Sequence, residues 1–340
     1  MKLLVTGGCG FIGSNFILKQ VQQHQNTVLN LDKLTYAGNS DNLLAVSMNN
    51  NYSFIEGDII DSNLLSELFN SFHPEAVVHF AAESHVDRSI DGPIEFIQTN
   101  IVGTATLLDT ALDYWQSIID KENRRKFRFL HISTDEVFGS LENDGLFTEN
   151  TPYDPSSPYS ASKAGSDHLV RAYYKTYGLP TLTTRGSNTY GPRQFPEKFI
   201  PLVILKALSG QSLPVYGDGQ QVREWIHVDD HVAGILAVLA RGEIGESYNI
   251  GSGFELKNIE LVKSLCDKLG IRCPGKDFSK MIKFVEDRPG HDRRYALDSS
   301  RANSEISWAP RISFEEGLRD TVDWYLANQG WCRAVSLNSP

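Results

Sequence analysis

The sequence has 340 residues, of which 41% are hydrophobic and 10% aromatic, and this composition predicts a folded protein with a large buried core. Its 32 Lys and Arg residues against 42 Asp and Glu residues give a net charge of −10, which argues against a nucleic-acid surface because phosphate binding needs clustered cations. The longest central apolar run, residues 232–240, is far shorter than the roughly 20 residues of a membrane-spanning helix, and no signal-peptide pattern opens the chain. We therefore expect a soluble, cytoplasmic protein with no membrane partner.

The cysteines carry no pattern of their own. Cys9, Cys266, Cys273 and Cys332 show neither CxxC spacing nor neighbouring histidine pairs, so we expect four reduced thiols and no metal site.

Seven short runs rich in β-branched and apolar residues alternate with segments of helical length. They are KLLVTG, TVLNLD, SFIEGD, AVVHFAA, RFLHIS, LPTLTTR and SYNIG. This alternation is typical of βαβ units and predicts an α/β fold, a Rossmann-type doubly wound parallel sheet with helices on both faces. From about residue 191, prolines and irregular connections indicate a smaller mixed lobe made of insertions. We expect the Rossmann domain to cover 1–187 with 225–252 returning to it, the lobe to cover 188–224 and 253–330, and residues 331–340 to form a tail.

A glycine-rich string, TGGCGFIGS, follows the first predicted strand and leads into an apolar helix that opens with Phe11 and Ile12. Gly7, Gly10 and Gly13 have the GxxGxxG spacing, and glycines there permit a tight turn, close approach of a pyrophosphate and close packing of the helix. This string predicts a dinucleotide site.

The end of the second strand indicates which dinucleotide binds. Asp32 stands where a carboxylate would bind the adenosine ribose and repel a 2′-phosphate, so NAD is favoured over NADP. Lys33, directly after it, leaves NADP open.

Later strand ends add residues to this predicted site, because ligands of such sheets bind beyond the carboxyl ends of the strands. After the third strand, GDI offers Asp58 and Ile59 to the adenine. After the fourth, FAAES offers Phe80, Ala81 and Ala82 to the crevice.

The helical segment after Pro93 carries apolar residues on two adjacent stripes. They are Ile97, Ile101, Leu108 and Trp115 on one, and Phe96, Leu107, Tyr114 and Ile118 on the other. This arc is wider than one core requires and predicts a subunit interface, hence a homodimer. A deeply buried helix of a large monomer explains the pattern equally well.

Tyr159 and Lys163 lie four positions apart in SPYSASKAGSDHL, at the start of a helix that Ser157 and Pro158 favour. Both side chains fall on one helix face. A phenol is a poor base at neutral pH, but a nearby ammonium and a nicotinamide cation would lower the pKa of Tyr159. The pair could then remove a hydroxyl proton while hydride leaves the same carbon for NAD.

These motifs resemble those of the extended short-chain dehydrogenase/reductase superfamily and, within it, of the nucleotide-sugar 4,6-dehydratases. The resemblance covers nearly the whole chain, through LDKLTYAGN, HFAAESHVDRSI, STDEVFGS, SNTYGPRQFPEKFIPL, LPVYGDGQQVREWIHVDDH and DRPGHDRRYALD. The adjacent Asp135 and Glu136 are typical of the dehydratase branch, whereas the C4-epimerases carry small or hydroxyl residues there. Two positions depart from the usual pattern, Thr189 in place of a second asparagine and Arg193 in place of an aromatic residue.

The resemblance implies dehydration of dTDP-glucose to dTDP-4-keto-6-deoxyglucose by oxidation at C4 with NAD, loss of water across C5 and C6, and hydride return to C6. Oxidation at C4 makes the C5 proton acidic, so the elimination requires a base and an acid close together. The resemblance implies Glu136 as the C5 base, Asp135 as the acid to the 6-hydroxyl, and Thr134 as a hydrogen-bond partner of the 4-oxygen beside Tyr159. Because consecutive residues of a regular strand point to opposite faces, the strand must break or turn here.

Binding residues follow from the same resemblance. Besides the residues already named, the cofactor is expected to contact Lys33, Leu34, Thr35, Ser84, Thr99, Tyr159, Lys163 and Asn188. The nucleotide sugar is expected to contact Ser84, His85, Val86, Asp87, Thr134, Asn188, Lys198, Pro214, Tyr216, Arg223, Asn258, Arg288, His291 and Tyr295. Lys198, Arg223 and Arg288 are the cations expected to hold the diphosphate, a role for which Arg is well suited.

Three alternatives stay open. The same dehydration could act on another nucleoside diphosphate hexose such as UDP-glucose. A C4-epimerase or a uronate decarboxylase is disfavoured by Asp135 and Glu136. A non-catalytic NAD-sensing protein on this fold would be expected to lose Tyr159 or Lys163, and both are present.

Overall fold

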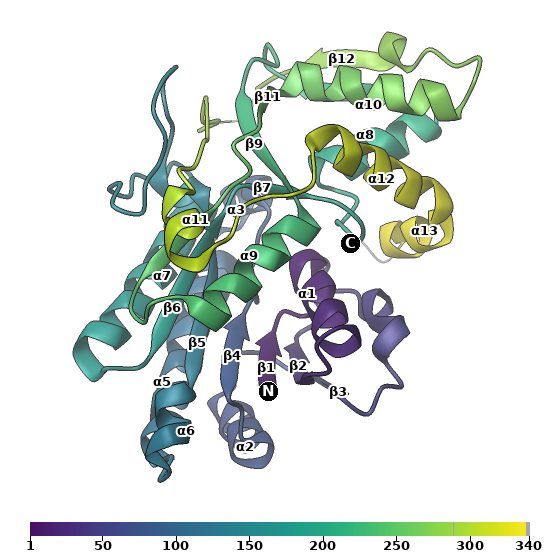
Figure 1. Ribbon diagram of the computed structural model, residues 1–340. Coiled ribbons are helices and arrows are strands. Elements are labelled where there is room, and N and C mark those ends of the chain that lie inside the picture. The colour runs from purple at the N-terminus through teal and green to yellow at the C-terminus, as the bar shows by residue number, and fades with distance from the viewer. Residues whose placement is uncertain (288, 338–340) are drawn as a thin grey trace.

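The computed structural model describes residues 1–287 and 289–337, and its largest element is a seven-stranded parallel sheet in the order β10-β6-β5-β4-β1-β2-β3 (Figure 1). Its strands are β1 (Lys2–Thr6), β2 (Thr27–Asp32), β3 (Tyr52–Glu56), β4 (Ala76–His79), β5 (Arg128–Thr134), β6 (Thr181–Gly186) and β10 (Ser247–Ile250). They correspond to the seven runs found in the sequence. The predicted Rossmann-type fold is confirmed.

Helices cover both faces of the sheet because successive apolar side chains of the buried strands point to opposite faces. In β1, Leu3 and Val5 belong to the core shared with α1 (Phe11–Gln22), α9 (Val228–Arg241) and α11 (Ser300–Ile306). Leu4, between them, belongs to the opposite core, shared with α2 (Ser62–Phe72), α5 (Thr104–Ser117) and α7 (Pro158–Tyr177). The carboxyl ends of the strands point toward the smaller lobe (Figure 1).

The smaller lobe contains the remaining strands. A mixed sheet has the order β11-β9-β7, and β12 pairs in parallel with β8. The strands are β7 (Asn188–Tyr190), β8 (Leu213–Tyr216), β9 (Val222–His227), β11 (Glu255–Lys257) and β12 (Ile282–Val285). After β9 the chain returns to the large sheet through α9 and β10, which pairs with β6.

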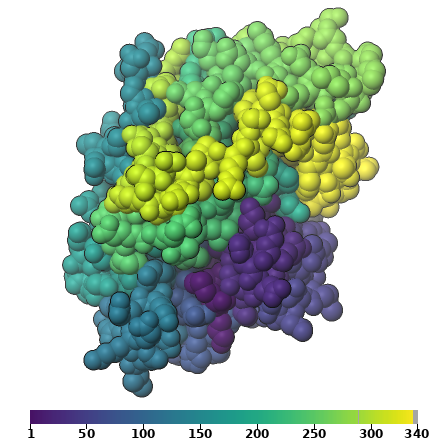
Figure 2. Space-filling model, viewed as in Figure 1, coloured from purple at the N-terminus to yellow at the C-terminus, as the bar shows by residue number. Residues whose placement is uncertain are grey.

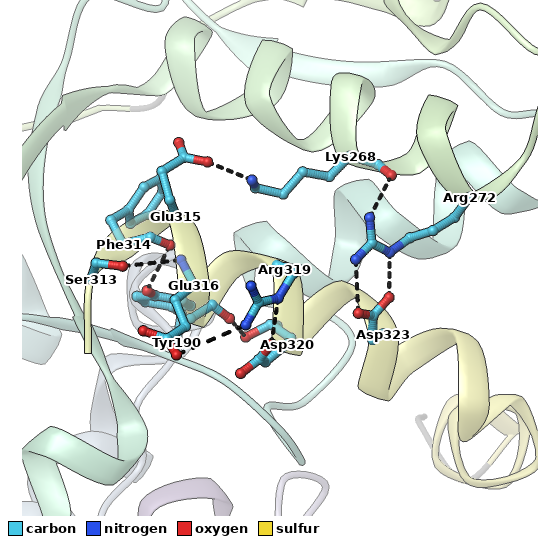
Figure 3. A network of polar contacts seen from close by, with 12 residues as sticks. Tyr190, Lys268, Arg272, Ser313, Phe314, Glu315, Glu316, Arg319, Asp320 and Asp323 are labelled. Carbon is cyan, nitrogen blue, oxygen red and sulfur yellow. Dashed lines mark hydrogen bonds and ion pairs between the residues drawn. The ribbon is translucent and has the colours of Figure 1, made fainter. Parts of the chain in front are cut away.

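Three helices of the lobe, α8 (Phe199–Leu208), α10 (Asn258–Arg272) and α12 (Phe314–Ala327), pack around one apolar cluster. Ion pairs tie α10 to α12 at the surface (Figure 3). Lys268 Nζ lies 2.6 Å from Glu315 Oε2, and the guanidinium of Arg272 binds both carboxylate oxygens of Asp323. The lobe therefore has a core of its own.

The remaining helical segments connect or cover these parts. They are η1 (Ser40–Val46), α3 (Val86–Asp91), α4 (Pro93–Phe96), the π-helical η2 (Ile97–Gly103), α6 (Lys121–Lys126), η3 (Asp135–Phe138), η4 (Phe278–Met281) and α13 (Gln329–Leu337). Among the described helices none is long and apolar enough to cross a membrane. All four cysteines lie within the described residues, and none of them forms a disulfide.

The C-terminal part of the chain joins the two parts of the molecule. Figure 2 shows it in yellow, crossing the green surface from α11 to α12. Residues from 331 onward, expected as a tail, instead lie in α13 as far as residue 337. The reason is burial, because Trp331 and Cys332 pack on the lobe cluster and Trp331 Nε1 donates to Asn42 Oδ1 at 2.9 Å.

Candidate active site

The glycine-rich turn between β1 and α1 leaves room for a ligand's phosphates. Gly7 has a φ of +71°, and a Cβ there would lie 2.5 Å from the backbone nitrogen of Ala81. A Cβ on Gly13 would lie 2.5 Å from the Gly7 carbonyl oxygen, whereas one on Gly10 would meet only that oxygen within 4 Å. Two of the glycines therefore permit the turn and its packing, and Gly10 leaves the space above the turn open.

Asp32 is fixed at the end of β2 by the backbone. Its two carboxylate oxygens accept hydrogen bonds from the N–H groups of Cys9 at 2.8 Å and Leu34 at 2.9 Å. Burial raises the pKa of Asp32, and these two bonds oppose that shift. Lys33 forms an ion pair with Asp58 at 2.7 Å, so its ammonium is already paired beside the predicted ribose site.

One cleft along the carboxyl ends of the strands brings the predicted cofactor residues together. All of them line it except Leu34, whose backbone N–H holds Asp32. The lining residues are Gly7, Gly10, Phe11, Ile12, Gly13, Asp32, Lys33, Thr35, Asp58, Ile59, Phe80, Ala81, Ala82, Ser84, Thr99, Tyr159, Lys163 and Asn188. The cleft thus extends from the end of β2 to the ends of β5 and β6.

Sequence reasoning missed several residues at the β6 end of this cleft, among them Ser133, Gly186, Ser187, Gln194 and His231, and Thr189, noted in the sequence as a departure from the family pattern, also lines it. Among the cleft residues from the end of β6 to α9, four atoms are buried and have no hydrogen-bond partner among the described residues. They are Ser187 Oγ, Asn188 Oδ1, Gln194 Oε1 and His231 Nε2. Buried polar atoms of this kind normally have partners, so a polar ligand group fits this end as a dinucleotide's phosphates fit the other.

The end of β5 shows how two neighbouring carboxyls face one cleft. The strand stops at Thr134, and Asp135 and Glu136 begin the 3₁₀ helix η3. Successive residues of such a helix are about 120° apart rather than on opposite faces. Thr134 Oγ1 accepts from the Glu136 backbone N–H at 3.3 Å and donates to Asp135 Oδ1 at 3.1 Å. Both carboxyls line the cleft, as the expected break in the strand requires.

The environment of Asp135 favours its protonated form. The residue is 2% exposed, and its Oδ2 has no hydrogen-bond partner among the described residues. Burial raises the pKa of Asp135 well above its ordinary value, and the carboxylates of Glu136 and Glu224 raise it further, while Arg223 opposes them. A carboxyl that stays protonated at neutral pH can act as an acid.

Tyr159 and Lys163 lie in the first turns of α7, which begins with a capping box between Ser157 and Ser160. Lys163 Nζ donates to the Ile132 carbonyl oxygen at 2.8 Å, and burial lowers the pKa of Lys163 to about 8. Burial and then Glu136 raise the pKa of Tyr159, against a hydrogen bond with Thr134. The sequence predicted a lowered pKa for Tyr159. The protein groups alone do not produce it, because desolvation of the phenolate outweighs the groups that stabilise the phenolate.

A buried ion-pair network lies behind this pair. Asp167, one helical turn after Lys163, contacts His131 Nε2 at 3.2 Å, Arg185 Nε at 3.1 Å and the Tyr153 hydroxyl at 2.6 Å. Hydrogen bonding to His131 and the charge of Arg185 hold the pKa of Asp167 well below its usual range despite its burial. The network anchors α7 to β5 and β6.

The residues predicted to bind the nucleotide sugar are divided between the cleft and the lobe. Ser84, Thr134, Asn188 and Lys198 line the cleft, and Lys198 Nζ donates to the Ser84 carbonyl at 2.7 Å. The Arg223 guanidinium lies 4.3 Å from the ring centre of Tyr295, and burial and then the charge of Glu136 raise the pKa of that phenol. The charge of Arg223 also acts on Asp135, so Arg223 and Tyr295 both interact electrostatically with the carboxyl pair.

The other predicted sugar residues that the structure describes do not line that cleft. His85 precedes α3, which contains Val86 and Asp87, and His85 Nε2 lies 3.6 Å from Glu197. Pro214 and Tyr216 lie in β8, with the Tyr216 ring 6.3 Å from that of His291, and Asn258 begins α10. His291 Nδ1 lies 2.6 Å from Asp287 Oδ1, and Arg288 falls outside the described residues.

Comparison with known proteins places this site in a class. A profile of the GDP-mannose 4,6 dehydratase family matches residues 4–321, so the chain belongs to that family. A dTDP-glucose 4,6-dehydratase of Xanthomonas campestris pv. campestris is 56% identical over 335 residues, which are 98% of this chain and 95% of the relative. The dTDP-glucose 4,6-dehydratase 1 of Escherichia coli K12 is 52% identical over 341 residues, which are 97% of this chain and 94% of that one.

Solved structures give the same result. DesIV, the dTDP-glucose 4,6-dehydratase of Streptomyces venezuelae, superimposes with a TM-score of 0.91 at 48% identity, covering 98% of this chain and 100% of that one. That structure contains NAD and dTDP.

Proposed function

We propose that this protein is an NAD-dependent nucleotide-sugar 4,6-dehydratase, a hydro-lyase that converts dTDP-glucose to dTDP-4-keto-6-deoxyglucose. The observation that carries the proposal is the pair Asp135 and Glu136 in one short helix, at the end of a dinucleotide cleft that also contains Tyr159 and Lys163. When bound, NAD supplies the hydride acceptor for C4 and the hydride donor for C6. The names of the close relatives support this substrate and this cofactor.

Tyr159 takes the proton of the 4-hydroxyl at its phenolic oxygen. Lys163, held by the Ile132 carbonyl, places an ammonium on the same face of α7, where it favours the phenolate. Thr134, at the end of β5, hydrogen-bonds the 4-oxygen beside that phenol. These three side chains orient C4 over the cofactor end of the cleft.

Glu136 removes the C5 proton, which is acidic once C4 is a ketone. Asp135, kept protonated by burial, gives its proton to the departing 6-hydroxyl. Glu136 then returns a proton to C5, and no net oxidation occurs. Arg223 and Lys198 hold the diphosphate, so that the sugar reaches the carboxyl pair from the lobe side.

A homodimer is also proposed, from the exposed apolar side chains before α5. Ile94 is 64% exposed and Ile97 41%, and with the partly exposed Ile101 they follow helical spacing on one face. Phe96, Leu107 and Leu108 of the same segment are buried in the subunit's own core. A cytoplasmic location stays a prediction of the sequence.

Light scattering tests the dimer. Wild-type protein is expected to have twice the subunit mass, and Ile97→Asp the subunit mass. Ile271→Asp, at an exposed isoleucine of α10 in the lobe, serves as the control and should remain dimeric. A monomeric wild type would contradict the proposal.

The activity is tested by incubating the protein with dTDP-glucose or UDP-glucose and following the products by mass spectrometry. We expect dTDP-glucose to lose one water with no lasting accumulation of NADH. Faster conversion of UDP-glucose would overturn the choice of nucleotide. Release of an epimer without loss of water would overturn the reaction.

A further inference from the structure

His231 is a buried histidine that the proposed chemistry does not use. It lies in the first turn of α9, 2% exposed, and is among the residues that line the cleft. Its Nδ1 lies 2.7 Å from Thr189 Oγ1, whereas its Nε2 has no hydrogen-bond partner among the described residues. A buried ring nitrogen left without a partner costs free energy, so the open hydrogen-bonding position of His231 Nε2 points to a ligand group.

Thr189 indicates which ring nitrogen carries the proton. Its hydroxyl donates to the Ser187 carbonyl oxygen at 3.1 Å, and a hydroxyl has one proton, so toward His231 it acts as the acceptor. Burial lowers the pKa of His231 to about 4, which leaves the ring neutral at neutral pH. The neutral ring then has its proton on Nδ1 and an acceptor lone pair on Nε2.

Gly186 fixes the ring in this position. A Cβ on Gly186 would lie 2.4 Å from His231 Cε1 and 2.6 Å from Nε2, so the imidazole packs directly on the end of β6. In the sheet register Gly186 is the partner of Thr134. His231 is therefore held at the strand end adjacent to the residues proposed to act at C4.

The position along the cleft identifies the ligand group. A dinucleotide with its ribose at Asp32 and its pyrophosphate on the glycine-rich turn brings its nicotinamide ring to the β5 and β6 ends. The carboxamide of that ring carries two N–H donors. We propose that His231 Nε2 accepts a hydrogen bond from the nicotinamide carboxamide, and that Thr189 is the positioning residue that sets the tautomer of the ring. This inference rests on the proposed use of NAD.

Equilibrium binding to the nucleotide-free full chain, measured by calorimetry, tests it with three ligands. NAD carries the carboxamide, 3-acetylpyridine adenine dinucleotide has a methyl ketone without N–H donors in its place, and ADP-ribose lacks the ring. His231→Leu removes the acceptor, and Thr189→Val removes the hydroxyl at nearly constant volume. Thr181→Val, which removes a buried hydroxyl at the far end of β6, is the matched control.

We expect His231→Leu to weaken NAD binding by roughly tenfold, the worth of one such hydrogen bond, and Thr189→Val to weaken it by less. Both variants should bind ADP-ribose and the acetylpyridine analogue as the wild type does, and Thr181→Val should change none of the three. Unchanged NAD binding in His231→Leu would overturn the inference, and so would equal weakening of NAD and ADP-ribose. If the wild type binds neither NAD nor ADP-ribose, the proposed cofactor itself is wrong.

A second comparison does not require His231→Leu to fold. It measures the affinities of NAD and of the acetylpyridine analogue for the wild type and for Thr189→Val. Wild-type protein should prefer NAD to the acetylpyridine analogue, and Thr189→Val should reduce that preference. A wild type that binds the two dinucleotides equally well would contradict the proposed hydrogen bond.

Discussion

Thr134 Oγ1 donates a hydrogen bond to Asp135 Oδ1 over 3.1 Å and thereby joins the last residue of β5 to the first residue of η3. Beside this contact, Asp135 and Glu136 both line the cleft. This arrangement is the geometric basis for assigning an acid and a base to adjacent positions.

Removing either carboxyl should stop the elimination without releasing the substrate. We predict that Asp135→Asn and Glu136→Gln each lower the rate of 4-keto product formation by roughly 10²- to 10⁴-fold, the usual contribution of a general acid or base. Calorimetry should show nucleotide-sugar affinity close to that of the wild type. Glu142→Gln, at an exposed carboxylate just after η3, is the control, and normal rates in the two test variants would refute their assigned roles.

Asp32 should determine the preference for NAD. Asp32→Asn removes the charge that binds the ribose and repels a 2′-phosphate, so NAD binding should weaken by roughly ten- to a hundredfold while NADP loses less. Fluorescence titration with both dinucleotides measures the ratio. Asp41→Asn, an exposed aspartate of η1, should leave it unchanged. An unaltered ratio in Asp32→Asn would show that another residue discriminates between the two.

Lys163 predicts a pH dependence of stability. Burial lowers its pKa from 10.5 to about 8, so between these values the unfolded chain binds more protons and the stability of the wild type rises with pH. Lys163→Met lacks this gain. As the pH rises from about 8 to 10.5, the unfolding free energy of the wild type should therefore increase relative to that of Lys163→Met by up to about 3 kcal/mol.

Urea denaturation at several pH values measures this shift. Lys163→Met should also lose most activity at every pH, because the phenol loses its ammonium neighbour. A stability difference that stays constant across the window would show that the buried amine is not titrating there.

Asp167 should stabilise the fold through its contacts with His131, Arg185 and Tyr153. Asp167→Asn should cost about 3–5 kcal/mol of unfolding free energy at pH 7, because it leaves the Arg185 charge buried without its partner. The pKa of Asp167 is lowered in the folded state, so the stabilisation is present above the ordinary aspartate pKa and is lost as pH falls below it. The stability difference between the two proteins in urea denaturation should therefore shrink progressively as the pH falls below about 4.

Glu67→Gln, at an exposed glutamate of α2, is the control for that experiment and should be neutral at both pH values. Equal stability of Asp167→Asn and wild type at pH 7 would show that the network contributes nothing net.

The sequence predicted the large sheet well, because its seven strands are bounded by polar turns and the glycine-rich turn follows the first one directly. Residues of the cofactor cleft could be found because they cluster at strand ends. His231 could not be found in this way. It is 42 positions from Thr189, its nearest hydrogen-bond partner, and only the packing of α9 on β6 brings the two together.

Other differences have equally physical causes. The strand break at Asp135 was expected, but its form, a 3₁₀ helix capped by Thr134, depends on hydrogen bonds that sequence spacing does not reveal. The pKa of Tyr159 is raised mainly by burial, and burial cannot be read from a sequence motif. The helix α13 stands where a tail was expected, because Trp331 donates a hydrogen bond to Asn42, which lies near the opposite end of the chain.

The measurement that tests the central claim most directly is the conversion of dTDP-glucose in deuterated water, analysed by NMR and mass spectrometry. If Glu136 removes the C5 proton and later returns one, the 4-keto-6-deoxy product should carry deuterium at C5, and Glu136→Gln should yield almost no product. Unlabelled product, or no product from either dTDP-glucose or UDP-glucose, would contradict the account.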